Sequence, residues 1–154
     1  MTSSDPPIHR KAKDFRWEAV EVLPYKEDGR ALFRAITRQV LFCDQAQESE
    51  LRYFEVAPGG FSTLERHEHT HNVLILRGRG HCLIGREVRR LATHDLVAVP
   101  PLTWHQFRAT TDEPLGFLCM VNTARDKPQL PSAEDVKNLE QEPKIADFLR
   151  GKSI

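Results

Sequence analysis

Short apolar stretches separated by polar turns make up most of this chain. They recur at hairpin spacing between residues 51 and 122, with glycine, aspartate or proline between them, which is typical of β-strands joined by tight turns. Eight or more short strands of this kind predict an all-β fold, namely a single jelly-roll barrel. The expected strands are WEAVEVLP (17–24), ALFRAITRQVLFC (31–43), LRYFEVAP, the histidine segment, NVLILRG, GHCLIG, EVRRL, DLVAVP, WHQFRAT and LGFLCMVN.

The hydrophobic pattern changes in the C-terminal tail. Apolar residues there follow helical spacing, and Ser132 stands three residues before Asp135, as in a helix N-terminal capping box. Pro143 lies inside the pattern and is expected to split it into two short helices. The chain is therefore divided into a flexible arm at 1–16, a barrel at 17–125 and a tail with short helices at 126–154.

Three histidines alternate in the segment ERHEHTH: His67, His69 and His71. If this segment is an extended strand, the three imidazoles and the preceding Glu65 project from one face. Neutral imidazole and carboxylate are common ligands of first-row transition metals. The segment therefore predicts a metal site, the alternative being a fortuitous surface cluster.

The spacing of these residues resembles the first motif of the cupin family, G(X)5HXH(X)3-4E(X)6G. In the ungapped register Glu65, His67 and His71 occupy the ligand positions, with one carboxylate and one imidazole exchanged relative to the family pattern. A second register pairs His67 with His69 and needs a two-residue deletion. The resemblance implies a single cupin barrel with a metal in it, and it leaves Glu65 and His69 as alternatives for one ligand.

A looser second motif follows in the segment PPLTWHQFRA, where His105 stands at the position of the family's fourth ligand. His94, Leu102 and Ala109 replace the glycine, glycine and asparagine of the family pattern, so the turns must be made differently. The implied ligand set is Glu65, His67, His71 and His105. Oxygen and nitrogen donors of this kind suit Mn²⁺, Fe²⁺ or Ni²⁺, with Zn²⁺ also possible.

Roughly residues 17–150 also resemble one group of small bacterial cupins, through stretches such as WEAVEVLPYKEDG, LERHEH, TWHQFRA and IADF. That group includes the 1-methylthioxylulose 5-phosphate sulfurylases, or methylthiotransferases, of a methionine-salvage route. The resemblance implies a manganese enzyme that transfers the methylthio group to glutathione and leaves 1-deoxyxylulose 5-phosphate. Two other functions stay open: an Fe- or Mn-dependent dioxygenase of a small molecule, and a non-catalytic ligand-binding cupin.

Cys119 is the candidate catalytic residue. Its strand is expected to form a hairpin with the strand of His105, which would bring the thiol beside that imidazole on the inner face. A thiol near a metal and imidazoles would have a lowered pKa and act as an acid or a nucleophile. The alternative is a small hydrophobic residue in the core. Cys43 and Cys82 are interpreted as core residues.

Further polar side chains on the strands are candidates for substrate contact. Arg38, Arg52 and Arg108 can clamp a phosphate or a carboxylate, because the guanidinium group matches their geometry. Tyr53 or Gln106 can bind a sugar hydroxyl group. The alternative for each of them is a position on a solvated strand face.

Composition excludes several classes of function. Lys+Arg and Asp+Glu number 22 each, so the formal net charge is zero, and no basic stripe indicates a nucleic-acid partner. No apolar run reaches membrane-spanning length and no apolar signal segment opens the sequence, so we expect a cytoplasmic protein without a membrane partner. Three cysteines without CxxC spacing argue against a disulfide framework.

The expected partners are therefore a small-molecule substrate, glutathione as co-substrate, and a second copy of the chain. A homodimer is expected through the N-terminal strands at 17–43, because an apolar strand such as ALFRAITRQVLF is an aggregation hazard if its edge stays exposed.

Overall fold

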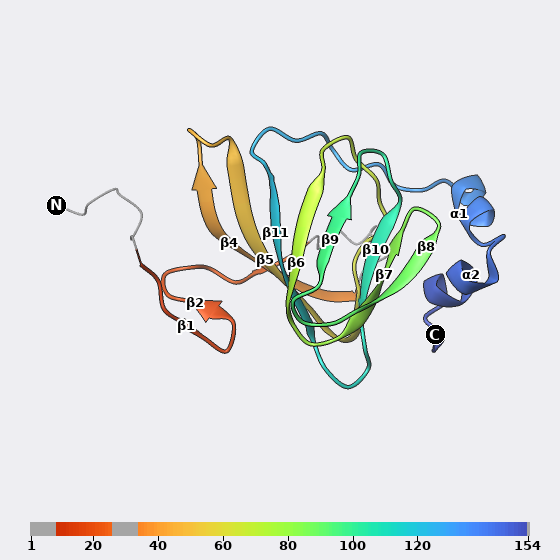
Figure 1. The fold of residues 1–154 in the computed structure, drawn as a ribbon, viewed down its shortest axis with the longest axis horizontal. Coiled ribbons are helices and arrows are strands. Elements are labelled where there is room, and N and C mark those ends of the chain that lie inside the picture. Colours follow the sequence, from red (N-terminus) through yellow and green to blue (C-terminus); the bar gives the residue numbers. More distant parts are fainter. Residues whose placement is uncertain (1–8, 26–33, 154) are drawn as a thin grey trace.

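The computed structural model of this chain describes residues 9–25 and 34–153, which form antiparallel strands and two short C-terminal helices (Figure 1). The elements are β1 (Ala12–Lys13), β2 (Arg16–Trp17), β3 (Leu23–Pro24), β4 (Arg34–Asp44), β5 (Ser49–Phe61), β6 (His71–Arg77), β7 (Gly80–Ile84), β8 (Glu87–Leu91), β9 (Leu96–Val99), β10 (His105–Ala109), β11 (Leu115–Asn122), α1 (Ala133–Leu139) and α2 (Pro143–Leu149).

A single curled sheet forms the body of the molecule, with the strand order β8-β7-β10-β5-β11-β6-β9 and with β4 and β3 joined to it through β5. The long strand β5 connects its two halves: it pairs with β11 along residues 49–56, with β10 at Phe61, and with β4 along its other edge. The predicted all-β fold is confirmed, and the seven strand segments expected between residues 51 and 122 outside the histidine segment coincide with observed strands.

The prediction of one N-terminal strand at 17–24 is wrong. Only the two pairs Arg16–Trp17 and Leu23–Pro24 are strands, because Ala19 adopts a positive φ of 56° and the chain turns between them. The strand expected at 31–43 is observed from Arg34 to Asp44, and its first expected residues lie outside the described part of the chain.

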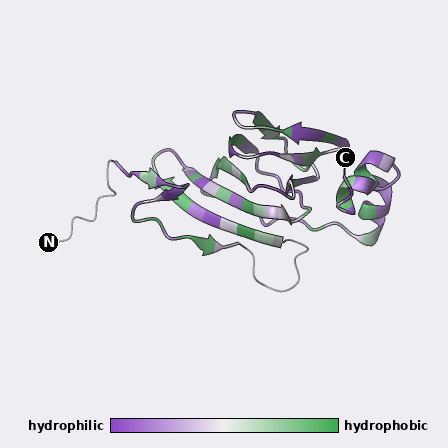
Figure 2. Ribbon diagram, turned by 90° about the horizontal axis from the view of Figure 1, so that it is seen from below, coloured by the Kyte–Doolittle hydropathy of each residue, from purple (hydrophilic) through white to green (hydrophobic). Residues whose placement is uncertain are grey.

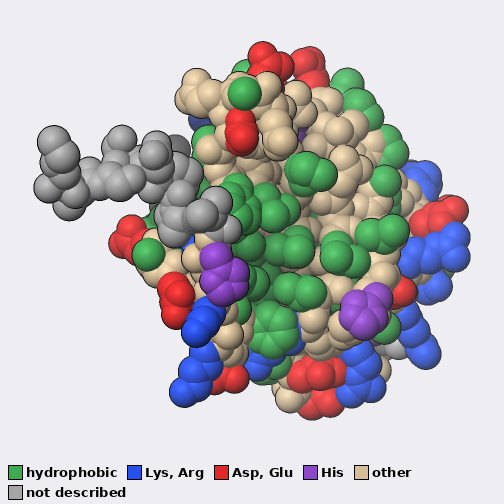
Figure 3. All heavy atoms as spheres, turned by 60° about the vertical axis from the view of Figure 1, so that its left-hand side comes forward, with side chains coloured by type: hydrophobic (Ala, Val, Ile, Leu, Met, Phe, Trp, Pro, Cys, Tyr) green, Lys and Arg blue, Asp and Glu red, His purple; other side chains and the backbone are tan. Residues whose placement is uncertain are grey.

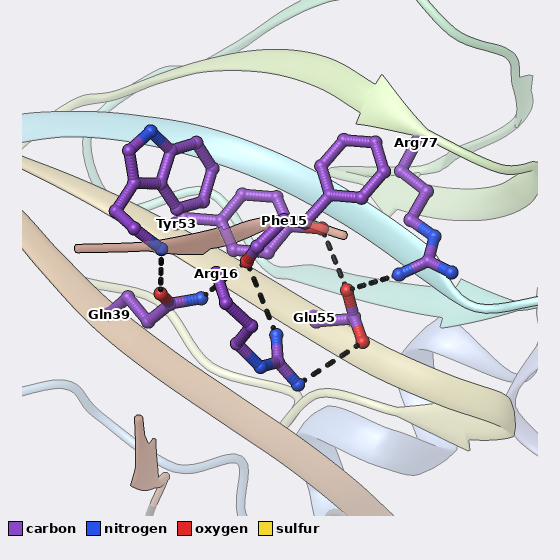
Figure 4. Close-up of polar contacts among 7 residues, drawn as sticks. Phe15, Arg16, Gln39, Tyr53, Glu55 and Arg77 are labelled. Carbon is purple, nitrogen blue, oxygen red and sulfur yellow. Dashed lines mark hydrogen bonds and ion pairs between the residues drawn. The ribbon is translucent and has the colours of Figure 1, made fainter. Parts of the chain in front are cut away.

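The described part of the arm forms a small hairpin that packs on the outer face of the sheet (Figure 4). The rings of Phe15 and Trp17 lie 5.8 and 5.1 Å from the ring of Tyr53 on β5. Gln39 of β4 donates to the Phe15 carbonyl at 2.8 Å and accepts from the Trp17 amide at 3.3 Å. The boundaries of the arm, barrel and tail remain predictions, although this hairpin attaches the residues from Ala12 onward to the barrel.

Alternation along β5 separates the two faces of the sheet. Tyr53 and Glu55 point outward, where the Tyr53 hydroxyl donates to Glu55 at 2.9 Å, and Phe54 and Val56 point into the barrel. The same alternation is visible as changing hydropathy along the long strands in Figure 2. The inner core contains Ile36, Phe54, Val56, Val73, Ile75, Cys82, Leu91, Phe107, Leu115, Phe117, Cys119 and Val121.

The two helices cover the outer side of the β7–β8 hairpin. Leu139 of α1 and Ile145 and Phe148 of α2 pack against Leu83 and Val88 in a second apolar cluster. The Ser132–Asp135 capping box is present, and Pro143 begins the second helix, so both tail predictions are confirmed. Neither of these helices, nor any other in the described ranges, is long and apolar enough to cross a membrane.

Candidate metal centre

The histidine segment lies in the connection between β5 and β6 and is not a strand. Residues 62–70 form two isolated bridges, Glu65 with His105 and Arg66 with Gln129, and β6 begins only at His71. The expected continuous histidine strand is therefore wrong. The Glu65–His105 bridge has both backbone hydrogen bonds, at 3.2 and 3.0 Å, so the carboxylate residue and the second-motif histidine are held side by side.

The predicted ligands nevertheless converge around His67. Its ring centroid lies 4.4 Å from that of His71 and 4.8 Å from that of His105. The ligand atoms of Glu65, His67 and His105 all lie within 4.8 Å of one another, and so do those of His67, His69 and His71. The structure thus brings all five candidate residues into one cluster, and His69, which stacks on His67 at 3.7 Å, belongs to it as fully as Glu65 does.

Hydrogen bonds to Nδ1 orient three of these imidazoles. His67 Nδ1 lies 2.7 Å from the His69 carbonyl oxygen, and His105 Nδ1 lies 2.9 Å from that of Thr103. A carbonyl oxygen only accepts, so Nδ1 carries the proton and Nε2 keeps its lone pair. Nε2 of His67 is buried and has no hydrogen-bond partner. A buried acceptor of this kind fits a metal ligand, because a bound cation would satisfy it.

The third oriented imidazole depends on an aspartate from the loop after β11. Asp126 Oδ1 lies 2.6 Å from His69 Nδ1, and Asp126 also accepts backbone hydrogen bonds from Glu68 at 2.7 Å and His69 at 3.0 Å. These contacts, the Glu68 bond above all, hold the pKa of Asp126 well below its usual range, so the group stays a carboxylate. Sequence reasoning missed Asp126, because only the fold brings it to the histidines.

Burial keeps the central imidazoles neutral. It lowers the pKa of His71 to about 2, with help from the neighbouring His105, and it also lowers the pKa of His67. An imidazole with a lowered pKa carries no proton on one nitrogen at neutral pH and can donate that lone pair to a metal. Glu65, His67 and His105 are only 6%, 1% and 3% exposed, so the cluster is shielded from solvent.

A small cavity inside the barrel opens beside the cluster. Its wall combines the polar side chains of Glu65, His71 and His105 with an apolar part, and Cys119 lies in the same wall. The other lining residues are Tyr25, Ile36, Phe54, Ser62, Thr63, Phe107 and Phe117. Such a combination of apolar walls and a few convergent polar groups is typical of a small-molecule site.

Cys119 reaches this cavity by a different route from the one expected. The predicted hairpin between β10 and β11 is wrong: β10 pairs with β7 and β5, whereas β11 pairs with β5 and β6. Cys119 faces inward because it alternates with Phe117 and Val121 on β11. Burial raises the pKa of the Cys119 thiol, against the expected lowering, and the nearby Arg52 offsets only part of this effect.

Three other residues that were candidates for substrate contact make contacts within the fold instead. Tyr53 lies under the N-terminal hairpin, Gln106 donates to the Ser62 carbonyl at 2.8 Å, and Arg108 donates to the Leu149 carbonyl at 2.9 Å, so these three support the fold. Cys82 is a core residue as expected, but Cys43 is exposed and not in the core.

Comparisons with known proteins agree with this geometry. The sequence model described as a cupin domain matches residues 52–121. A 1-methylthio-D-xylulose 5-phosphate methylsulfurylase from Rhodospirillum rubrum is 54% identical over 150 residues, which is 97% of this chain and 96% of that protein.

Solved structures show the same barrel. A cupin 2 conserved barrel domain protein from Rhodopseudomonas palustris is 52% identical, with a TM-score of 0.87 over 91% of this chain and 97% of its own. A cupin-2 domain protein from Rhodospirillum rubrum is 54% identical, with a TM-score of 0.85 over 95% and 98% of the two chains. The cupin fold implied by the motif resemblance is thereby confirmed.

Proposed function

Because this chain belongs to the cupin family, we propose that it is a metal-dependent enzyme that removes the methylthio group from 1-methylthio-D-xylulose 5-phosphate. The observation that carries this proposal is its 54% identity, over nearly the whole length of both chains, to a methylsulfurylase of that substrate. The histidine cluster and the adjoining cavity supply a site where the reaction can occur.

The reaction that we propose transfers the methylthio group to glutathione. The C1–S bond of the substrate breaks, a disulfide bond forms between the methylthio sulfur and the glutathione sulfur, and C1 takes up a proton to become the methyl group of 1-deoxyxylulose 5-phosphate. C1 is reduced by two electrons and the two sulfur atoms are oxidised together, so glutathione is both acceptor and reductant. No further oxidant is needed.

Glu65, His67, His71 and His105 are the residues that we propose as metal ligands, with His69 as the alternative to Glu65. The donor set suits Mn²⁺, which we propose as the native ion, and also Fe²⁺, Ni²⁺ or Zn²⁺. When bound, such an ion supplies Lewis acidity toward the oxygen atoms of the substrate. Asp126 and the carbonyl groups of His69 and Thr103 keep the imidazoles in the tautomer that such a site requires.

Cys119 is the proton donor that we propose for C1. Its thiol lies in the cavity wall with Glu65, His71 and His105, and burial raises its pKa, so it carries a proton at neutral pH. A protonated thiol can deliver that proton to the carbon atom from which sulfur departs. The proton is then restored from the glutathione thiol, which loses its own on forming the disulfide.

The reaction is tested by incubating the manganese-loaded protein with 1-methylthioxylulose 5-phosphate and glutathione. We expect equal amounts of 1-deoxyxylulose 5-phosphate and methylthio-glutathione disulfide, measured by mass spectrometry, with no oxygen consumed. Consumption of O2 with no disulfide product would contradict the transfer and favour a dioxygenase. Binding of the substrate without turnover, with any of the candidate metals, would favour a non-catalytic ligand-binding cupin.

We also propose that the protein acts as a homodimer through its N-terminal strands at residues 17–43, in the cytoplasm, where glutathione is kept reduced. Apolar side chains gather on one face of the surface (Figure 3). Phe42 of β4 is 53% exposed, and within the described residues β4 has a partner on its outer edge only at Thr37 and Arg38. An exposed apolar strand edge of this kind is a natural interface.

Light scattering is expected to give twice the chain mass of 17.7 kDa. Phe42→Arg should shift the protein toward the monomer, because a charged side chain would then be buried at the interface. Lys137→Ala, on the helix at the other end of the molecule, serves as the control. A wild-type monomer at high concentration would contradict the dimer.

A further inference from the structure

Two arginines lie on the inner side of the sheet beside the cavity. Arg52 of β5 is 5% exposed, and Arg38 of β4 is half-buried. Arg38 stands directly opposite Phe54 across the β4–β5 ladder, and Arg52 is two residues from Phe54 on the same strand, so the two arginines share the inner face with it. Diagonal neighbours of this kind are about 7–8 Å apart, within reach of long side chains.

Each guanidinium group contacts a residue of the cavity wall. Arg52 lies 5.0 Å above the ring of Phe54, and its Nη2 is 3.8 Å from the sulfur of Cys119. Arg38 lies 5.8 Å from the ring of Tyr25, which in turn meets Phe54 edge-on at 5.0 Å. Phe54, Tyr25 and Cys119 all line the cavity.

The hydrogen-bonding capacity of the two groups is not used up by the protein. Nε of Arg38 and Nε of Arg52 are both buried and make no hydrogen bond, and Nε of Arg52 has only a looser ion-pair contact with Glu50 Oε1 at 3.5 Å. A buried donor without a partner costs free energy, and a charged donor costs more, so such groups in a native structure indicate a missing acceptor.

Charge in this region is also unbalanced. Among the described residues, Arg38 has no ion-pair partner, while Arg52 shares Glu50 with Arg125, each guanidinium lying 3.5 Å from the same carboxylate oxygen. The positive charge of Arg38 is therefore unpaired among the described residues, and that of Arg52 is only partly offset. A buried and a half-buried guanidinium group that lack a full counter-charge attract an anion.

We propose that Arg38 and Arg52 form an anion subsite that holds the phosphate group of the substrate. The assignment rests on the proposed function for the identity of the anion, a sugar phosphate, but not for the site itself. A phosphomonoester carries nearly two negative charges and accepts paired N–H bonds from guanidinium groups. With its phosphate bound there, the ketose would lie along the wall that contains Phe54 and Cys119, toward the histidine cluster.

The subsite is tested by calorimetry with the product 1-deoxyxylulose 5-phosphate and with its unphosphorylated form, neither of which needs turnover. Arg52→Met and Arg38→Met keep an unbranched apolar stem in place of each side chain and remove its guanidinium group. Relative to wild type, we expect the phosphorylated compound to bind at least about 30-fold more weakly to Arg52→Met and at least about 10-fold more weakly to Arg38→Met. Binding of the unphosphorylated compound should change less than about threefold in both variants.

Three further measurements complete the test. The control variant Arg89→Met removes an exposed arginine on β8 that pairs with Glu87. It should bind the phosphorylated product as wild type does. Arg52→Lys restores the charge without the planar fork, and we expect it to recover part of the affinity. Inorganic phosphate should compete with the phosphorylated product for wild type and not for Arg52→Met.

The outcomes separate this inference from the proposed function. Variants that fold, keep their metal and bind the phosphorylated product as wild type does would overturn the subsite, even if the enzyme transfers the methylthio group. A protein that does not turn over 1-methylthioxylulose 5-phosphate, yet loses phosphate-ester binding in both arginine variants, would keep the subsite and overturn the reaction.

Discussion

His67→Ala and His105→Ala are each expected to reduce the bound metal from about one ion per chain to less than about one tenth, and to abolish methylthio release. His67 is the residue shared by both groups of converging ligand atoms, and His105 is fixed to Glu65 by two backbone hydrogen bonds. Removing either imidazole leaves a site with one ligand fewer, and the neighbouring His69 is held in its own position by Asp126. Metal content after purification, measured by elemental mass spectrometry, checks this.

His81→Ala is the matched control, because His81 is a half-buried histidine of β7 outside the cluster. Its metal content and turnover should equal those of wild type. Unchanged metal in both His67→Ala and His105→Ala would remove the cluster as the metal site, whatever the activity of the protein.

The same measurement decides between the two registers of the histidine motif. Glu65→Gln is expected to lower the metal affinity more than His69→Ala, because it removes the one negative charge that the cluster directs at a dication. Glu65 is also the more buried and is held by its bridge to His105, whereas His69 is held through Asp126. The reverse order of effects would assign His69 as the ligand.

Local patterns predicted most of the barrel correctly. Strands such as NVLILR and GHCLI carry β-branched and apolar residues between glycine turns, and each forms where the pattern places it. The capping box at Ser132 was also predictable, because it depends on two residues three positions apart. The helix break at Pro143 was predictable because proline itself causes it. These features need no knowledge of distant contacts.

The errors concern long-range pairing. The histidine alternation resembled a strand, but the ligands meet because Glu65 bridges to His105 and the segment then turns toward β6. Short turn length suggested that β10 and β11 are partners, yet both pair with the long strand β5. The residues that reach the site across such connections, Asp126 above all, have no local signal. Arg52 did have a local signal, since the alternation of inward and outward residues along β5 places it on the same face as Phe54.

Cys119→Ser is expected to reduce turnover by at least about 100-fold while metal content and fold remain. A serine hydroxyl group is a far weaker acid than a thiol, so it cannot supply the proton that C1 needs. The change also buries a hydroxyl group in a partly apolar wall, which should cost about 1–2 kcal/mol of unfolding free energy. Steady-state rates and chemical denaturation measure the two effects separately.

Cys82→Ser separates chemistry from packing. Both thiols are 1% exposed on inward-facing strand positions, and burial raises the pKa of both, that of Cys82 to about 11. Cys82, however, does not line the cavity, so its replacement should lower stability by a similar amount and leave turnover within about twofold of wild type. If Cys119→Ser behaves like Cys82→Ser in both assays, Cys119 is only a core residue, and the proton at C1 comes from another group of the cavity wall.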